Sequence, residues 1–441
     1  IATRNCMNER NFVEIETPVL MKSTPEGARD FLVPSRLHTG RFYALPQSPQ
    51  TYKQLLMISG FDRYFQIVKC FRDEDCRSDR QPEFTQIDIE MSFVDQSDII
   101  RLGTDLTRHI WKSVVDVDLP KDFPILNYDD AMERYGSDKP DIRFGMELME
   151  MAPYIEKSDF KVFKSILENE GRVKGLVCPN AHKYSRKVID ELTEYLMQYF
   201  NAKGLAWMKC VEGKLDGGIS KFFPEKIRNK MISDFNIEND HIIFVVGDNV
   251  KTVFSALGAL RLALGKRENI INTNVWAPLW ITDFPLVDWN EDQKRWDALH
   301  HPFTSPNLED MDKLETDPGN VRSLGYDIVI NGYELGGGSI RIYDKNLQSK
   351  IFTLLGIGAE EAQKKFGFLM DAFCYGAPPH GGMAFGFDRI VMLLAGSNQI
   401  RDVIAFPKTT SALSLMDQSP SPVSEIQLQE LHLSIIKEKE E

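Results

Sequence analysis

The dipeptide Asn331-Gly332, which separates the apolar runs YDIVI and YELGG, constrains the fold of this chain more than any other short feature. Asn-Gly favours the two-residue turn that joins neighbouring antiparallel strands, because both positions adopt positive φ angles at little cost. The sequence therefore predicts a β-hairpin here. Pairing across the turn places Asp327 and Glu334 on one face as diagonal neighbours, about 7–8 Å apart at the backbone. Two such carboxylates either share a divalent cation or lie on an outer face of the sheet.

Three consecutive glycines, Gly336 to Gly338, follow in the second strand of this hairpin. Glycine weakens a strand unless another group approaches its backbone closely, so the run predicts such an approach. Arg341 follows with the strand parity opposite to that of Glu334. For both side chains to enter one site, a β-bulge must interrupt the glycine run, and we predict a bulge there.

A second antiparallel hairpin is predicted from residues 63–72, which have strong strand propensity, and residues 85–93, which alternate apolar and polar side chains. Such alternation usually indicates a sheet with one solvated face. Here the polar side carries Gln86, Asp88 and Glu90, and it lacks lysine and threonine. That composition favours a face that binds an ammonium group or a ribose.

Several basic residues stand where packing alone explains them poorly. Arg77 and Arg80 lie among acids in the loop of the second hairpin, where they are either solvated or able to reach phosphates. Lys53 falls in the first turn of a helix that we expect to be capped by Ser48, a place where the helix dipole disfavours a cation. It is either a surface residue or the partner of an anionic ligand. Arg389 opens an otherwise apolar helix, and a phosphate ligand explains it better than core packing does.

Composition leaves the function open. The 441 residues, 42% hydrophobic and 27% charged, are ordinary for a globular protein of more than one domain. A net charge of −13 argues against a nucleic acid as a first guess for the partner. Six scattered cysteines suggest neither a zinc site nor disulfides and fit a reducing cytoplasm. No apolar run approaches the ~20 residues that cross a bilayer, so we do not expect the chain to enter a membrane. From the net charge, we do not expect DNA as a partner.

The chain divides into four segments that differ in composition and in expected secondary structure. Residues 1–141 and 273–407 carry the polar clusters described above and are expected to form two parts of one domain. Residues 142–272 alternate helices with apolar strands and resemble an insertion, while residues 408–441 form a polar C-terminal extension. The chain opens at Ile1 within an expected helix and without an initiator methionine, so we expect an upstream segment.

Taken together, these segments resemble the three signature motifs of class II aminoacyl-tRNA synthetases, and most closely those of the bacterial-type aspartyl family. FVEIETPVL matches motif 1, CFRDED with its loop to RQPEFTQID matches motif 2, and GFDRIVMLL matches motif 3. Further aspartate-type signatures are TPEGARDFLVPS, ALPQSPQTYKQLLM, HHPFT, YELGGGSIR and RDVIAFPK. The resemblance covers nearly the whole chain. It implies an α+β fold, with the class II antiparallel sheet flanked by helices and an inserted α+β domain at residues 142–272.

The resemblance implies a cytoplasmic, homodimeric aspartate–tRNA ligase that uses ATP and Mg²⁺. Such an enzyme activates L-aspartate to aspartyl-adenylate with release of pyrophosphate, and then transfers the aspartate to the 3′ end of tRNA(Asp). Whether tRNA(Asn) is a second acceptor stays open. Family members carry an N-terminal anticodon-binding barrel, which is the upstream segment that we expect for this chain.

Three other functions compete with this one. An asparaginyl enzyme and a tRNA-independent aspartate–ammonia ligase share the fold, but the insertion and the GGGSIR sequence argue against both. A synthetase-like regulatory or RNA-binding protein without catalysis would be expected to lack Arg72, Glu334 or Arg389, and all three are present.

The resemblance also assigns site residues by position. Catalysis is assigned to Arg72, Glu334 and Arg389. Contacts to ATP are assigned to Arg72, Asp73, Glu74, Gln81, Phe84, Glu334, Gly386, Phe387, Asp388 and Arg389. The aspartate pocket is assigned to Glu26, Gln50, Lys53, Arg72, Gln86, Asp88, His300 and Arg341. Asp327 and Glu334 would bind magnesium, Arg77 and Arg80 would face the tRNA acceptor end, and Pro18 would lie at the dimer interface.

Within these sets the resemblance gives each group a chemical task. Arg72 would contact the α-phosphate of ATP and the α-carboxylate of the amino acid, while Phe84 would stack on adenine. Arg389 would hold the γ-phosphate. Lys53 and Arg341 would bind the side-chain carboxylate of aspartate, with help from His300. The amino group would be surrounded by Glu26, Gln50, Gln86 and Asp88.

Overall fold

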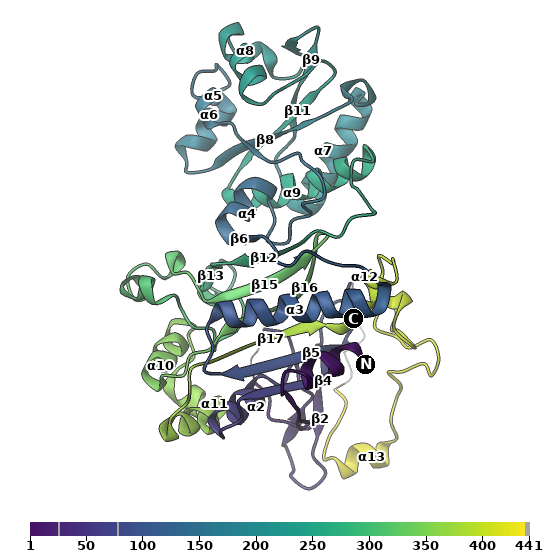
Figure 1. Ribbon diagram of the computed structural model, residues 1–441, viewed down its shortest axis with the longest axis vertical. Helices are drawn as coiled ribbons and strands as arrows, with labels where there is room; N and C mark the ends of the chain where they lie inside the picture. The colour runs from purple at the N-terminus through teal and green to yellow at the C-terminus, as the bar shows by residue number, and fades with distance from the viewer. Residues whose placement is uncertain (25–26, 77–78, 437–441) are drawn as a thin grey trace. The chain divides into compact units, whose positions relative to one another are not determined.

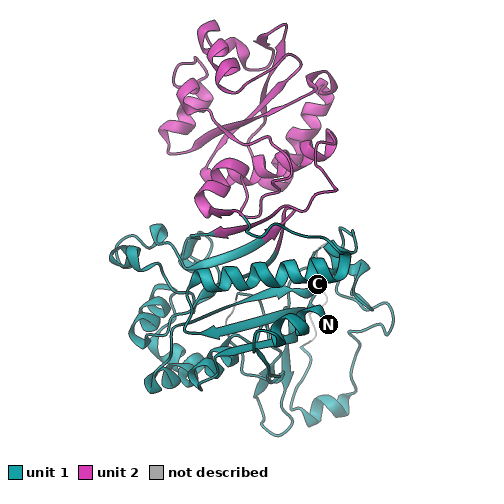
Figure 2. Cartoon of the chain, in the orientation of Figure 1, with its two compact units in different colours: residues 1–123, 282–328, 335–441 teal, residues 124–281, 329–334 magenta. Residues whose placement is uncertain are grey.

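The computed structural model describes residues 1–24, 27–76 and 79–436. The chain forms two compact units (Figure 2), of which unit 1 comprises residues 1–123, 282–328 and 335–441, and unit 2 comprises residues 124–281 and 329–334. The insertion expected at residues 142–272 lies within unit 2, together with the residues that flank it. Within the described ranges, no helix combines the length and the apolar character that a membrane span requires.

Unit 1 contains a mostly antiparallel sheet (Figure 1). Its strands follow the order β1 (Val13–Glu14), β4 (Arg63–Phe71), β5 (Glu83–Ser92), β17 (His380–Gly386), β16 (Tyr333–Ile340) and β15 (Gly325–Ile330). β1 runs parallel to β4, whereas the pairs β4–β5, β5–β17 and β17–β16 are antiparallel. The helices of this unit are α1 (Ala2–Asn8), α2 (Gln50–Ile58), α3 (Gln96–Val115), α10 (Lys345–Leu354), α11 (Ala359–Ala372), α12 (Phe387–Leu394) and α13 (Glu425–Glu430). This architecture confirms the α+β fold with helices flanking the sheet.

Helix α3 illustrates how the sequence determines an element of this unit. Asp95 caps its first turn, accepting a hydrogen bond from the backbone of Asp98, and the Asp98 side chain accepts one from the Asp95 backbone in return. One face of the helix is buried at a spacing of three or four residues, through Ile99, Leu102, Leu106 and Ile110. This face packs the helix onto the sheet at β17.

Helix α2 begins later than its sequence predicts. Pro49 occupies the N-cap position and no side chain caps the helix, so the prediction of Ser48 as the N-cap was wrong. The carbonyl oxygen of Pro49 accepts the first helical hydrogen bond, from the backbone of Lys53. Proline can take this place because it needs no backbone donor there.

The predicted turn at Asn331-Gly332 is confirmed. Both residues adopt positive φ angles, 54° and 85°, as the two-residue turn requires. The close approach predicted for the glycine run is also confirmed. A β-carbon at Gly336 or Gly338 would strike the backbone of β17, and one at Gly337 would strike the carboxylate of Asp327.

The predicted bulge in the glycine run was wrong. Residues 336–340 of β16 pair with residues 385–381 of β17 in an unbroken antiparallel register. The glycines accommodate the neighbouring strand by having no side chain, so the ladder needs no extra residue. Arg341 follows this regular stretch, and its backbone donates to the carbonyl oxygen of His380.

Unit 2 is built on a second antiparallel sheet, with the order β10 (Lys214–Asp216), β9 (Ala206–Val211), β11 (Ile242–Asp248), β8 (Arg172–Cys178) and β7 (Met149–Glu150). Its helices are α4 (Tyr128–Tyr135), α5 (Ala152–Ile155), α6 (Lys161–Glu168), α7 (Arg186–Phe200), α8 (Glu225–Asp234) and α9 (Val250–Arg267). Two further strands of the chain, β6 (Ile125–Asn127) and β12 (Pro278–Thr282), begin in this unit. Small hairpins elsewhere in the chain are β2 (Leu32–Pro34) with β3 (Phe42–Ala44), and β13 (Val287–Asn290) with β14 (Arg295–Ala298).

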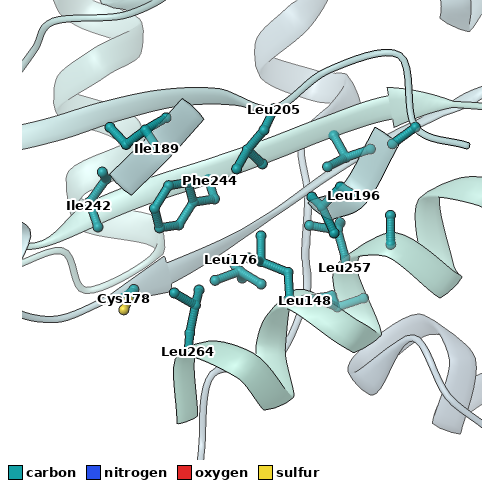
Figure 3. Packing of buried hydrophobic residues seen from close by; sticks show 14 of the residues in the cluster. Leu148, Leu176, Cys178, Ile189, Leu196, Leu205, Ile242, Phe244, Leu257 and Leu264 are labelled. Carbon is teal, nitrogen blue, oxygen red and sulfur yellow. The ribbon is translucent and has the colours of Figure 1, made fainter. Parts of the chain in front are cut away.

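Both faces of the unit 2 sheet are covered by apolar side chains. Ile242 and Phe244 of β11 pack in one cluster with α7 and α9 (Figure 3), whereas Ile243 and Val245 pack in a second cluster on the other face. A strand buried on both faces reads as a continuous apolar run, which explains the sequence IIFVV.

Candidate active site

The polar face of β5 lies inside the protein. Asp88 and Glu90 have fully buried side chains. Lys53 of α2 is 2% exposed, and its ammonium nitrogen lies 2.6 Å from Asp88 Oδ1 and 3.2 Å from Glu90 Oε2. This burial excludes the solvated-face interpretation of the alternating sequence, because charged groups are kept in an interior only when they are paired.

Arg341 completes the charged cluster. Its Nε and Nη2 atoms donate to the two oxygens of Glu90 at 2.9 and 3.1 Å, a two-pronged contact that fixes the guanidinium plane. Gly382 of β17 leaves the space for this contact, since a β-carbon there would collide with Glu90 Oε2. Arg341 and Lys53 together hold the pKa of Glu90 below its usual value even though burial acts to raise it.

The two adjacent histidines have different partners. His301 is half-buried, and its Nε2 atom contacts the Nη1 atom of Arg341. Burial, reinforced by Arg341, holds the pKa of His301 well below its usual value, so the neutral ring can accept this bond. His300 instead lies 3.4 Å from Asp327 through its Nε2 atom. The sequence assigned help in binding aspartate to His300, whereas the structure brings His301 to Arg341.

Two buried atoms, one in this cluster and one at the start of the β4–β5 loop, have no hydrogen-bond partner among the described residues. They are Asp88 Oδ2 and Arg72 Nε. Burial raises the pKa of Asp88, although Lys53 opposes that shift. An unmet carboxylate oxygen suits a ligand ammonium group, and an unmet guanidinium N–H suits a ligand carboxylate or phosphate.

Most of the residues assigned to ATP lie at the loop end of the β4–β5 hairpin. The guanidinium carbon of Arg72 lies 5.0 Å from the ring centre of Phe84, and the backbone of Arg72 donates to Pro82. Asp388, at the start of α12, accepts a hydrogen bond of 2.7 Å from the backbone of Thr85. Asp388 therefore braces the strand next to Phe84.

Charged residues of the motif 2 loop pair with one another and with α12. Arg389 Nη2 lies 3.5 Å from Asp79 Oδ2, and Arg80 Nη1 lies 3.3 Å from Glu74 Oε2. The backbone of Asp73 donates to the carbonyl oxygen of Arg29. Gly386 and Phe387 form the N-cap and the first residue of α12, as expected for a turn beside a phosphate site.

Gln81 is held by the C-terminal extension. Its side-chain Oε1 accepts from the Lys408 backbone at 2.7 Å, and its Nε2 donates to the Lys408 carbonyl oxygen at 3.2 Å. The ammonium group of Lys408 also lies 2.9 Å from Glu83 Oε1. No role is predicted for Lys408 from the sequence, because its partners lie more than 300 residues away along the chain.

The other assigned residues fall into three groups. Gln50 and Gln86 are buried, and Gln86 accepts a hydrogen bond from Cys70. Pro18 is exposed, in a stretch that also exposes Val19 and Leu20. Glu26 and Arg77 lie outside the described residues, and Glu334 belongs to unit 2, so its part in the site stays a prediction.

Magnesium in this region stays a prediction, which the residues present allow. Within residues 1–24, 27–76 and 79–436, no cluster of three or more His, Cys, Asp or Glu side chains could hold a metal. Magnesium needs no such cluster, because one or two carboxylates and the substrate phosphates suffice for it. Asp327, whose side chain is 13% exposed, offers one carboxylate of this kind.

Comparison with known proteins identifies the family of the chain. The family model "tRNA synthetases class II (D, K and N)" matches residues 1–410. An "Aspartate–tRNA ligase" of Staphylococcus saprophyticus is 56% identical over 98% of this chain and 74% of its own length. One of Halalkalibacterium halodurans is 56% identical over 99% of this chain and 73% of its own length. An "Aspartate–tRNA(Asp/Asn) ligase" of Caldanaerobacter subterraneus is 54% identical over 98% and 73%. The chain therefore belongs to the class II tRNA synthetases of the D, K and N group.

Proposed function

We propose that the chain is an aspartate–tRNA ligase. The observation that carries the proposal is the buried cluster in which Lys53 and Arg341 lie beside Asp88 and Glu90, with Asp88 Oδ2 lacking a hydrogen-bond partner among the described residues. Arg72 Nε is a second buried atom that lacks such a partner. A small ligand with two carboxylates and one ammonium group matches these groups in charge. The names of the relatives, which share more than half of its residues, point to the same ligand.

The first half-reaction forms aspartyl-adenylate. The α-carboxylate of aspartate attacks the α-phosphorus of ATP, the bond to the β-phosphate oxygen breaks, and pyrophosphate leaves. Arg72 and Arg389 stabilise the negative charge that builds on the phosphate oxygens. Magnesium held by Asp327 and Glu334 would supply further positive charge when it is bound. No side chain is needed as a nucleophile, so holding the reactants in place supplies much of the catalysis.

The same pocket explains the preference for aspartate over asparagine. Lys53 and Arg341 present buried N–H groups to the side chain of the amino acid. The NH₂ group of a neutral amide cannot accept from them, and a site built to bond one polar group can reject its analogue by roughly 10⁴–10⁵-fold. No editing domain is then required.

The second half-reaction needs the tRNA. We infer that the terminal ribose hydroxyl of tRNA(Asp) attacks the adenylate carbonyl, with Arg77 and Arg80 near the acceptor end. We also infer a homodimer that uses the exposed stretch around Pro18, and a cytoplasmic setting. The relative named for both tRNA(Asp) and tRNA(Asn) makes tRNA(Asn) the first alternative acceptor to test.

The direct test is ATP–pyrophosphate exchange by the 441-residue chain with single amino acids. We expect exchange with aspartate and at least about a thousandfold less with asparagine or lysine. Arg72→Ala serves as the inactive control. Exchange driven by asparagine or lysine in preference to aspartate would refute the proposal. Charging of purified tRNA(Asp) and tRNA(Asn) then identifies the acceptor.

A further inference from the structure

A chain of three buried side chains links α2 to β17. Gln50 Nε2 donates to Gln54 Oε1 at 3.1 Å, and Gln54 Nε2 lies 3.2 Å from His380 Nε2. His380 Nδ1 in turn lies 2.8 Å from the carbonyl oxygen of Pro378. The three side chains belong to residues that are 5%, 0% and 0% exposed, so water does not compete for these bonds.

The carbonyl oxygen of Pro378, where this series of hydrogen bonds ends, determines the direction of every bond in the series. A carbonyl oxygen such as that of Pro378 can only accept, so His380 must carry its proton on Nδ1. Burial lowers the pKa of His380, with Arg341 and Lys53 acting in the same direction and Glu90 opposing them, and the ring is then neutral at pH 7. The Nε2 atom of a neutral ring protonated on Nδ1 can only accept.

The orientation of His380 in turn determines the orientation of the two glutamine amides on α2. Because His380 Nε2 accepts, Gln54 must turn its NH₂ group toward it, which leaves Gln54 Oε1 facing Gln50. Gln50 must then turn its own NH₂ group toward Gln54. The side-chain oxygen of Gln50 is the acceptor that remains for a ligand.

We propose that Gln54 and His380 are positioning residues that hold the amide of Gln50 with its oxygen available to the α-ammonium group of the amino acid. This inference rests on the proposed function. Gln50 lies three residues before Lys53 and thus on the same face of α2, the face that presents Lys53 to Asp88. An amide turned the other way would offer N–H groups to an ammonium ion and repel it.

The test compares two ligands that differ in the ammonium group. Dissociation constants of L-aspartate and of succinate, which lacks the amino group, are measured calorimetrically with the 441-residue chain. We expect His380→Leu to weaken aspartate binding by about tenfold and to leave succinate binding within about twofold. Gln54→Leu should do the same, and the double variant should lose no more than either single one. His380→Gln, which restores an acceptor near the Nε2 position, should recover most of the affinity.

Thr107→Val supplies the control for general destabilisation. Thr107 is a buried polar residue of α3 whose hydroxyl donates to Gly103, outside the hydrogen-bond chain. Equal weakening of aspartate and succinate by His380→Leu would show a merely structural role, and unchanged binding of both would show no role; either result overturns the inference. Failure of the wild-type chain to bind aspartate would instead refute the proposed function.

Discussion

At the scale of single residues, Arg341 shows how one buried cation serves both structure and specificity. Its side chain is 1% exposed and donates two N–H groups to Glu90, so its charge is already paired before any substrate binds. Its Nη1 atom donates to the hydroxyl of Ser339 and contacts His301 Nε2. The aspartate side chain must therefore join an existing network rather than neutralise a bare charge.

Replacing Arg341 should separate these two roles. Arg341→Leu is expected to abolish aspartate-dependent exchange, to leave ATP binding measurable, and to destabilise the fold by about 3–5 kcal/mol because Glu90 is left buried and unpaired. The double variant Arg341→Leu/Glu90→Leu should regain stability without regaining exchange. Denaturant unfolding and pyrophosphate exchange measure the two effects, and an Arg341→Leu chain that still activates aspartate would contradict the assignment.

Asp310 predicts a pH dependence of stability. Hydrogen bonds from Arg322 and Lys313 hold the pKa of this carboxylate well below its usual value. A lowered pKa means that the stabilisation is present above the ordinary pKa of about 4 and is lost as the pH falls below it. Asp310→Asn should therefore flatten the fall of Tm between pH 5 and pH 2. Asp312→Asn, an exposed neighbour, should leave that fall unchanged.

At the scale of elements, the glycine run of β16 leaves space for the carboxylate of Asp327, the candidate metal ligand. Gly337→Ala would push its β-carbon into the carboxylate of Asp327. We expect the magnesium concentration for half-maximal exchange to rise severalfold. Gly358→Ala, whose β-carbon would meet open space, is the matched control. An unaltered magnesium dependence in Gly337→Ala would argue against Asp327 as a ligand.

The C-terminal extension contributes to the nucleotide site through Lys408. Lys408→Met keeps the backbone bonds to Gln81 but removes the ion pair with Glu83. Partly exposed pairs contribute ~0.2–1 kcal/mol, so the KM for ATP should rise about two- to fivefold while the KM for aspartate stays within twofold. Lys350→Met removes a comparable surface pair with Glu315 and should change neither constant.

The sequence predicts the elements well where a local rule governs them. The turn at Asn331-Gly332 depends on φ preference, and the strand expected over residues 85–93 depends on the twofold period of its side chains. The turn is confirmed, and the strand is confirmed over Glu83–Ser92. The prediction of a bulge failed because strand parity does not show that a strand of glycines can lie close to its neighbour without an extra residue. The choice between His300 and His301, and the link from Gln81 to Lys408, depend on tertiary packing that no local pattern records.

At the scale of the whole molecule, the chain is two units with separate cores. The cluster around Leu176, Phe244 and Leu257 lies within unit 2, whereas the charged cluster lies in unit 1. Leu257→Ala should leave a cavity that destabilises unit 2 by about 2–5 kcal/mol. Calorimetry should then show one unfolding transition lowered and another unmoved, with aspartate-dependent exchange retained at 25 °C. A uniform shift of all unfolding would indicate that the two units unfold together.

The formal charges in the pocket cancel, since Lys53 and Arg341 face Asp88 and Glu90, while the chain as a whole carries −13. An acidic metabolite diffusing toward this protein meets no distant attraction from the pocket, and selection begins only at contact range. Added salt weakens fields that reach beyond about 10 Å at 0.1 M. The long-range field that remains is the repulsion from the net charge of −13, so added salt should speed the capture of aspartate rather than slow it.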